Sequence, residues 1–215
     1  MLKRLQKLYP NLCELVVLEK GDVLILNNSS SNLYFVMYGI IQVGKVNVPQ
    51  RVITLVLLTT KQCFITSTVS SREYQIKSLN RSSILIIKTK DIVYLLKKIP
   101  IFFPLIIYGL YSYTLLVEDF ASIFIPRTTT KRTIALLLFL TKHFSVNNAN
   151  KVEVSINLSQ ANIAQLIGST RVSVNKVFQF LQKVKCLEIF AGKIIIKNPV
   201  FLAFLSGKNK NSQLY

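Results

Sequence analysis

One short stretch, residues 158–182, constrains the fold of this 215-residue chain more than any other. It reads LSQANIAQLIGSTRVSVNKVFQFLQ, with Ser159 and Thr170 each placed to cap a helix. Gly168 lies between the two predicted helices, where a positive φ costs glycine little. Apolar residues recur at helical spacing on both sides of that glycine, so the two helices can pack together. The pattern predicts a helix-turn-helix over residues 159–183, with an ordinary αα-hairpin as the alternative.

The residues after this motif extend it into a larger unit. Two short apolar runs, Cys186–Phe190 and Lys193–Lys197, flank the turn dipeptide Ala191-Gly192 and predict a two-stranded hairpin. A helix-turn-helix followed by such a hairpin is a winged helix, whose hairpin lies along the DNA backbone. We therefore expect a winged helix DNA-binding domain over residues 127–215.

The distribution of charge agrees with a polyanionic partner. The chain has 27 Lys and Arg against 9 Asp and Glu, a net charge of +18. Residues 126–215 contain 13 basic residues and only two acids, Glu153 and Glu188. Such a surplus most often indicates nucleic acid binding. Coding bias of an AT-rich genome explains part of the basicity, because 20 of the 27 cations are Lys, but it does not explain the shortage of acids.

Composition argues against several other classes of protein. The cysteines, Cys13, Cys63 and Cys186, are too few and too widely spaced for a disulfide scaffold or a zinc site. His143 is the only histidine, and the sequence has no Gly-rich phosphate loop and no nucleophile elbow. We expect no metal site and no enzymatic activity.

An uncharged run of 19 residues, 99–117, has the length of a membrane span. Pro100 and Pro104 lie at its start and Glu118 ends it, so the regular apolar helix is shorter than a span. We expect a long buried or dimer-forming helix over residues 104–126 and no membrane partner. A membrane-associated or interaction protein anchored by residues 99–117 is the alternative function.

The first hundred residues have the pattern of an all-β domain. Short runs of Val, Ile, Leu, Tyr and Phe alternate with Gly, Asn, Ser and Pro turns at near-regular spacing. About seven such strands are typical of a sandwich or jelly roll. The predicted strands are Leu15–Leu18, Val23–Leu26, Leu33–Met37, Ile40–Val43, Val52–Leu58, Tyr74–Leu79 and Ile84–Ile87.

Residues 155–199 resemble the DNA-binding domain of the Crp/Fnr family of bacterial transcription regulators. IGSTRVSVNKV (167–177) is similar in particular to the nitrogen-control branch of that family in cyanobacteria and red algal plastids. GDVLILNNSSSNLYFVMYGIIQVGK (21–45) resembles the glycine-punctuated strands of the family's β-roll. The resemblance implies an α+β fold. It has an N-terminal β-roll like the cyclic-nucleotide-binding jelly roll (1–103), a long dimerisation helix (104–126) and a C-terminal winged helix-turn-helix (127–215).

The resemblance also implies a function. The family's members are sequence-specific regulators that bind palindromic DNA as homodimers, so we expect a homodimer held by residues 105–125, with Leu116 in its seam. It further implies nitrogen-related gene control, transcription activation and a contact with RNA polymerase. The AT-rich composition favours the plastid stroma, in association with DNA, and the bacterial cytoplasm is the alternative.

DNA contacts follow from matched positions at the second helix. Arg171 is expected to read guanine through a bidentate contact, and Val172 to touch a thymine methyl. Lys176 would contact a base or a phosphate, while Asn175 either reads adenine or faces solvent. Expected phosphate contacts or caps are Ser159, Gln160, Ser169, Thr170 and Ser173, with Lys193 on the wing.

The resemblance gives less support for a small-molecule effector. The sequence lacks the Gly-Glu and Arg-Ser cassette of cyclic-nucleotide binders and the clustered cysteines of an iron–sulfur site. The nitrogen-control branch binds 2-oxoglutarate, and its pocket residues correspond here to Phe64, Arg72 and Glu118. Tyr113, however, stands where that branch has an arginine. Because a dicarboxylate needs paired cations, we expect 2-oxoglutarate to bind weakly or not at all.

Overall fold

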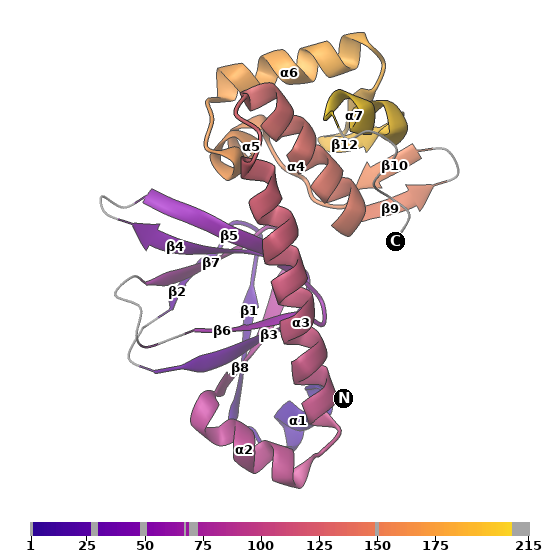
Figure 1. Cartoon of the computed structure of the whole chain (residues 1–215). Coiled ribbons are helices and arrows are strands. Elements are labelled where there is room, and N and C mark those ends of the chain that lie inside the picture. The colour runs from indigo at the N-terminus through magenta and orange to yellow at the C-terminus, as the bar shows by residue number, and fades with distance from the viewer. Residues whose placement is uncertain are drawn as a thin grey trace. The chain divides into compact units, whose positions relative to one another are not determined.

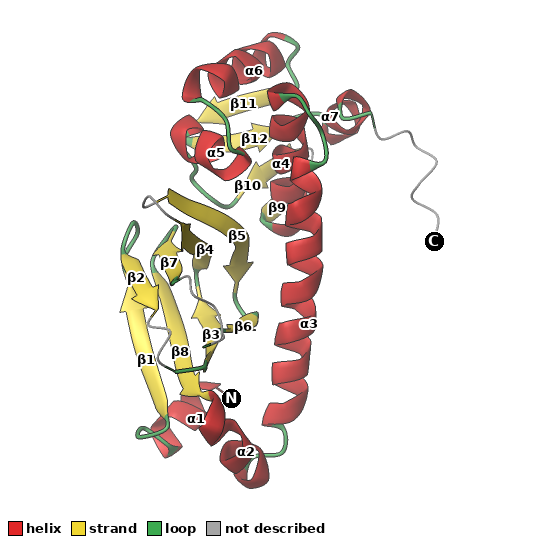
Figure 2. Ribbon diagram, turned by 60° about the vertical axis from the view of Figure 1, so that its left-hand side comes forward, coloured by secondary structure: helices red, strands yellow, loops and turns green. Residues whose placement is uncertain are grey.

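The computed structural model describes residues 2–26, 30–47, 51–66, 68, 73–148 and 151–207 (Figure 1). The chain divides into two compact units, Met1–Glu118 and Asp119–Tyr215. The first unit contains a β-roll and most of a long helix, and the second contains a winged helix-turn-helix (Figure 2). The predicted α+β fold class, with these three parts in this order, is confirmed.

Two four-stranded antiparallel sheets form the roll, since short β-branched and aromatic runs alternate with turns throughout this region. One sheet has the strand order β1-β8-β3-β6 and the other has the order β2-β7-β4-β5. Phe35, Ile41 and Ile76, each at most 1% exposed, belong to the core of this unit. The strands are β1 (Cys13–Leu18), β2 (Val23–Leu26), β3 (Asn32–Tyr38), β4 (Ile40–Asn47), β5 (Arg51–Thr59), β6 (Cys63–Ile65), β7 (Tyr74–Ser78) and β8 (Ser82–Lys88).

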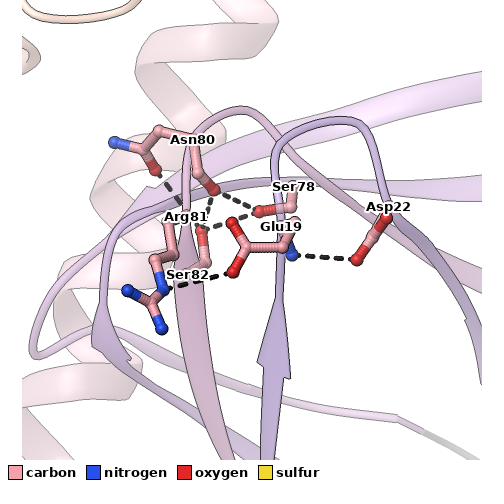
Figure 3. A network of polar contacts seen from close by, with 6 residues as sticks. All are labelled: Glu19, Asp22, Ser78, Asn80, Arg81 and Ser82. Atoms are coloured by element: carbon pink, nitrogen blue, oxygen red, sulfur yellow. Dashed lines mark hydrogen bonds and ion pairs between the residues drawn. The ribbon is translucent and has the colours of Figure 1, made fainter.

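A buried hydroxyl network fixes the corner where the chain passes from β7 to β8 (Figure 3). Ser78 and Ser82 are each 1% exposed, and Ser78 donates to the hydroxyl of Ser82 at 2.9 Å. Ser82 donates in turn to the carbonyl oxygen of Asn80 at 2.8 Å. An exposed ion pair between Arg81 and Glu19, 3.2 Å long, closes the same corner. Because a buried hydroxyl without a partner is costly, these bonds make the corner a fixed part of the roll.

Two short helices accompany the roll, α1 (Leu2–Leu8) and α2 (Thr89–Lys98). Helix α2 lies in a region that the sequence predicted to be all-β. It forms because Leu95 is fully buried, with Ile92 and Leu96 packed against the same core at helical spacing. The acid Asp91 in its first turn and the lysines in its last turn also suit the helix dipole.

The long helix α3 runs from Phe102 to Ala121, and a 3₁₀ turn, Ser122–Phe124, follows it. The regular helix thus begins and ends earlier than the predicted range 104–126, and Pro126 comes after the 3₁₀ turn. Within the described part of the chain, no helix is long and apolar enough to cross a membrane.

Helix α3 has one buried face and one exposed apolar face. Leu116 is 2% exposed and Ile106 is 7% exposed, so both are already buried within a single chain. The expectation that Leu116 lies in a dimer seam is therefore wrong. Because this helix is apolar almost all the way round, its sequence did not show which side would stay uncovered. The exposed face, called the α3 stripe below, comprises Phe103, Ile107, Tyr111 and Leu115.

In its described residues, the second unit packs four α-helices with one antiparallel sheet of order β11-β12-β10-β9 (Figure 2). Its core includes Leu137 of α4 and Phe178 of α6, at 0% and 1% exposure. A last helix, which was not predicted from the sequence, is capped by Asn198 with Pro199 in its first turn. The elements are α4 (Thr129–His143), β9 (Ser145–Asn148), β10 (Lys151–Val154), α5 (Gln160–Ile167), α6 (Arg171–Lys183), β11 (Leu187–Phe190), β12 (Lys193–Ile196) and α7 (Pro199–Leu205).

Candidate nucleic-acid interface

The helix-turn-helix is built by two caps and one glycine, as its sequence predicted. The hydroxyl of Ser159 accepts from the backbone N–H of Asn162 at 3.1 Å, and the Asn162 side chain accepts from the Ser159 N–H at 3.2 Å. Gly168 ends α5 in the left-handed conformation, with φ +65°. Thr170 then caps α6 by accepting from the Ser173 N–H at 3.2 Å. These local bonds fix where α6 begins.

The two helices bury one face each and leave the other face of α6 open. Ile163 and Ile167 of α5 and Val174 of α6 are all 0% exposed. On the opposite side of α6, Arg171, Val172 and Lys176 are exposed, and Asn175 is half-buried beside them. Val172 is 66% exposed, which is unusual for a valine on a packed helix and leaves its methyl groups accessible. This surface, called the α6 face below, is defined as Arg171, Val172, Asn175 and Lys176.

Gln179 extends the α6 face by one more helical turn. Its side chain is exposed, and it lies three residues after Lys176 and seven after Val172. Gln179 was not among the predicted DNA contacts. The helical spacing was a signal that could have identified it, but the stretch that is similar in particular to the nitrogen-control branch, residues 167–177, ends two residues before it.

Several predicted phosphate contacts are held by bonds within the protein. The Ser169 and Thr129 hydroxyls lie 3.1 Å apart, which ties the turn to the start of α4. The Thr170 and Ser173 hydroxyls lie 2.9 Å apart. Ser159 is exposed as the cap of α5, and Gln160 is half-buried next to it. These hydroxyls therefore first define the helix ends, and any contact with phosphate would be additional.

The wing is the hairpin of β11 and β12, and its lysines form ion pairs with acidic residues of the second unit. Lys193 donates to Glu153 of β10 at 2.6 Å, and Lys197 pairs with Glu188 at 2.5 Å across the hairpin. Lys193, expected to contact phosphate, is thus already in an ion pair.

Asp119, the remaining acid of the second unit, is also paired. Its carboxylate accepts from Lys142 at 2.7 Å and lies 2.6 Å from the His143 ring nitrogen. Partial burial raises the pKa of Asp119, but the hydrogen bonds and charges of Lys142 and His143 outweigh it, so the pKa is lowered. Arg171 and Lys176, by contrast, make no ion pair or side-chain hydrogen bond with the described residues. The α6 face therefore has the uncompensated positive charge that a polyanion would meet.

The three predicted effector residues do not share one environment in the structure. Phe64 is 1% exposed and stacks between Tyr34 and Tyr113, with ring centroids 5.0 and 6.2 Å apart. Glu118 is exposed. Arg72 lies outside the described residues. The structure thus brings Phe64 together with Tyr113, within the first unit.

Comparison with known proteins agrees with this geometry. Residues 131–205 match the family of Crp-like helix-turn-helix domains. The chain is 27% identical over 188 residues to ycf28 of Porphyra purpurea, whose name describes an HTH-type transcriptional regulator; the match covers 86% of this chain and 79% of that protein. It is 28% identical over 179 residues to the global nitrogen regulator of Nostoc sp. PCC 7120, covering 81% of this chain and 80% of that protein.

A solved structure shows the same fold. The CooA mutant of Carboxydothermus hydrogenoformans superimposes with a TM-score of 0.73 at 17% identity, over 90% of this chain and 88% of that chain. Roll, long helix and winged helix-turn-helix together define a transcription regulator. More narrowly, residues 131–205 match the Crp-like helix-turn-helix domain, and the similarity to the ycf28 and global nitrogen regulator proteins agrees with the resemblance to the Crp/Fnr family seen in residues 155–199.

Proposed function

We propose that the protein binds a palindromic DNA operator as a homodimer and reads it with the α6 face. The observation that supports this most strongly is the pair of exposed cations, Arg171 and Lys176, which have no ion-pair partner among the described residues and lie on the first two turns of α6 in a Crp-like domain. A guanidinium at the start of a recognition helix can form two hydrogen bonds to the O6 and N7 atoms of guanine. Val172, adjacent and exposed, suits a thymine methyl group.

The remaining residues of the site would either contact bases, which specifies sequence, or contact phosphates, which positions the protein on the DNA. Asn175 and Gln179 can present amide groups to adenine from the same side of α6. Lys176 supplies affinity through base or phosphate contact. Ser159, Gln160, Ser169, Thr170 and Ser173 would donate to phosphates at the two helix N-termini, where the helix dipole also favours an anion. Lys193 would contact phosphate only by giving up some of its interaction with Glu153.

The α3 stripe supports a homodimer. Phe103, Ile107, Tyr111 and Leu115 recur every four residues and are between 42% and 62% exposed. Such a row of large apolar side chains on one helix face is suited to pack against the same row of a second copy. A two-fold dimer would present two copies of α6 to half-sites one helical turn apart.

Nitrogen-related control is the regulatory role we propose, with activation through a contact with RNA polymerase. It is supported by the similarity to global nitrogen regulators of cyanobacteria. The relative from Porphyra purpurea and the Lys-rich, AT-biased composition support a plastid location for the protein, in the stroma. We propose that 2-oxoglutarate binds weakly or not at all, since the aromatic Tyr113 takes the place of a cation.

Selection of bound DNA from a random pool tests the proposal most broadly. We expect enrichment of sites with two inverted half-sites whose centres are one helical turn apart. The resemblance to the nitrogen-control branch implies that each half-site resembles GTA or its TAC complement. A pool that stays random, or sites without two-fold symmetry, would contradict the proposal.

A further inference from the structure

Three aromatic rings join the roll to the long helix inside the first unit. Tyr34 of β3 and Phe64 of β6 stack at 5.0 Å with an interplanar angle of 15°. Phe64 and Tyr113 of α3 stack at 6.2 Å and 24°. Tyr34 and Phe64 are only 2% and 1% exposed, so two sheet residues and one helix residue share a buried contact. These residues are called the aromatic stack below.

The backbones of β6 and α3 also approach closely, one helical turn before Tyr113. A Cβ atom added to Gly109 would lie 2.5 Å from the Sγ atom of Cys63, which only glycine avoids. The Cys63 thiol in turn lies 3.7 Å from the carbonyl oxygen of Ile106. Burial raises the pKa of Cys63 to about 12, so this thiol stays neutral and packs as a small apolar group. Figures 1 and 2 both show β6 beside α3.

Tyr113 connects the same region to the second sheet of the roll. Burial, followed by the nearby Tyr74 hydroxyl, raises the pKa of Tyr113, so the phenol is uncharged at neutral pH. Lys45 lies over the Tyr74 ring at 4.7 Å from its centroid. The side chain at position 113 therefore stacks on a ring of one sheet and lies within electrostatic range of the Tyr74 hydroxyl of the other, and it adds no positive charge that could bind a dicarboxylate.

We propose that the aromatic stack couples the roll to α3, as a bound effector would, without any small molecule. Operator binding would then be independent of an effector. The proposal depends on the proposed DNA-binding function and concerns how that function is regulated.

Effectors act by shifting the populations of two conformations. An effector activates a regulator only when it binds the competent conformation more tightly than the other conformation. Here the groups that hold β6 against α3 are covalent parts of the chain and are already in contact. No entropy is lost in bringing a separate molecule to the contact between β6 and α3. Phe64 and Tyr113 are positioning residues in this account, because they act on DNA only through α3.

Operator binding by the full chain, measured by fluorescence anisotropy with a site selected from the random pool, tests this proposal. We expect thoroughly dialysed protein to bind tightly. Millimolar 2-oxoglutarate or cyclic AMP should change its affinity by less than about twofold, well below the roughly 5–150-fold typical of allosteric coupling. A rise of about tenfold or more with either compound would overturn the proposal while leaving DNA binding intact. Failure of the wild type to bind any selected site would instead contradict the proposed function.

Substitutions at Tyr113, in the aromatic stack, provide a second test in the same binding assay. Tyr113→Ala should lower operator affinity by about tenfold, the equivalent of one lost aromatic contact, and leave affinity for scrambled DNA unchanged. Tyr113→Phe, which keeps the ring, and Tyr38→Ala, an exposed tyrosine of the same unit outside the stack, should both bind as wild type. Wild-type operator affinity for Tyr113→Ala would overturn the proposal. If Tyr113→Ala does not fold, the effector titrations of the wild-type protein test the proposal by themselves.

Discussion

Tyr111→Glu gives a direct test of the dimer proposed through the α3 stripe. Tyr111 is 62% exposed in the single chain, so a glutamate there is solvated and should leave the fold of the monomer unchanged. In the dimer, each subunit would bury one carboxylate near the two-fold axis. An uncompensated buried charge costs about 3 kcal/mol or more, and two of them cost about 6 kcal/mol per dimer. The dimer dissociation constant should therefore rise by about four orders of magnitude.

Sedimentation equilibrium over a range of concentrations measures that constant. The chain provides a matched control, because Tyr38 at the end of β3 is also 62% exposed but lies away from the stripe. Tyr38→Glu adds the same charge at the same exposure and should sediment as the wild-type dimer. If Tyr111→Glu also sediments as wild type, or if both variants dissociate equally, the α3 stripe is not the interface.

Other expected outcomes concern charge. Lys176→Gln should reduce the dependence of log affinity on log salt by about one unit for every DNA sequence, as expected for one lost phosphate contact. Lys193→Gln should reduce it by less, because Glu153 already balances that ammonium; equal slopes in salt titrations of both variants would contradict this. Asp119→Asn should lower the melting temperature at pH 7. Since the folded-state pKa of Asp119 is lowered, its contribution is present above the unfolded-state pKa and is lost as pH falls through the folded-state value, so wild type and variant should converge in acid. A difference that persists unchanged in acid would show that Asp119 acts without its charge.

Local signals were sufficient to predict the helix-turn-helix. Both caps and the left-handed glycine act over three or four residues, so Ser159, Gly168 and Thr170 could be assigned from spacing alone. The residues of the α6 face were instead predicted from positions matched to the family that the sequence resembles. The α+β order of roll, long helix and winged helix was predicted because strand-like and helix-like periodicities separate clearly along the chain.

What the sequence did not predict depends on contacts between distant residues. The buried side of α3 is set by which helix residues meet the roll, and an apolar run offers no contrast from which to choose, so Leu116 was misplaced. Helix α2 was missed because a short apolar run suits a strand as well as a helix. The ion pair of Lys193 with Glu153 joins residues 40 positions apart, and the aromatic stack joins three separate elements.

Arg171 on the α6 face is proposed to read DNA sequence, and a comparison of operator with scrambled DNA tests this role. Affinities for the selected operator and for a scrambled duplex are measured for the wild type, Arg171→Ala and Arg171→Lys at one salt concentration. We expect Arg171→Ala to lose about 1–3 kcal/mol of binding free energy on the operator and far less on scrambled DNA. Arg171→Lys keeps the charge but not the planar fork, so it should retain binding to scrambled DNA and lose operator preference. An equal loss on operator and scrambled DNA for Arg171→Ala would show that Arg171 contacts only the backbone, and that α6 does not read bases in this register.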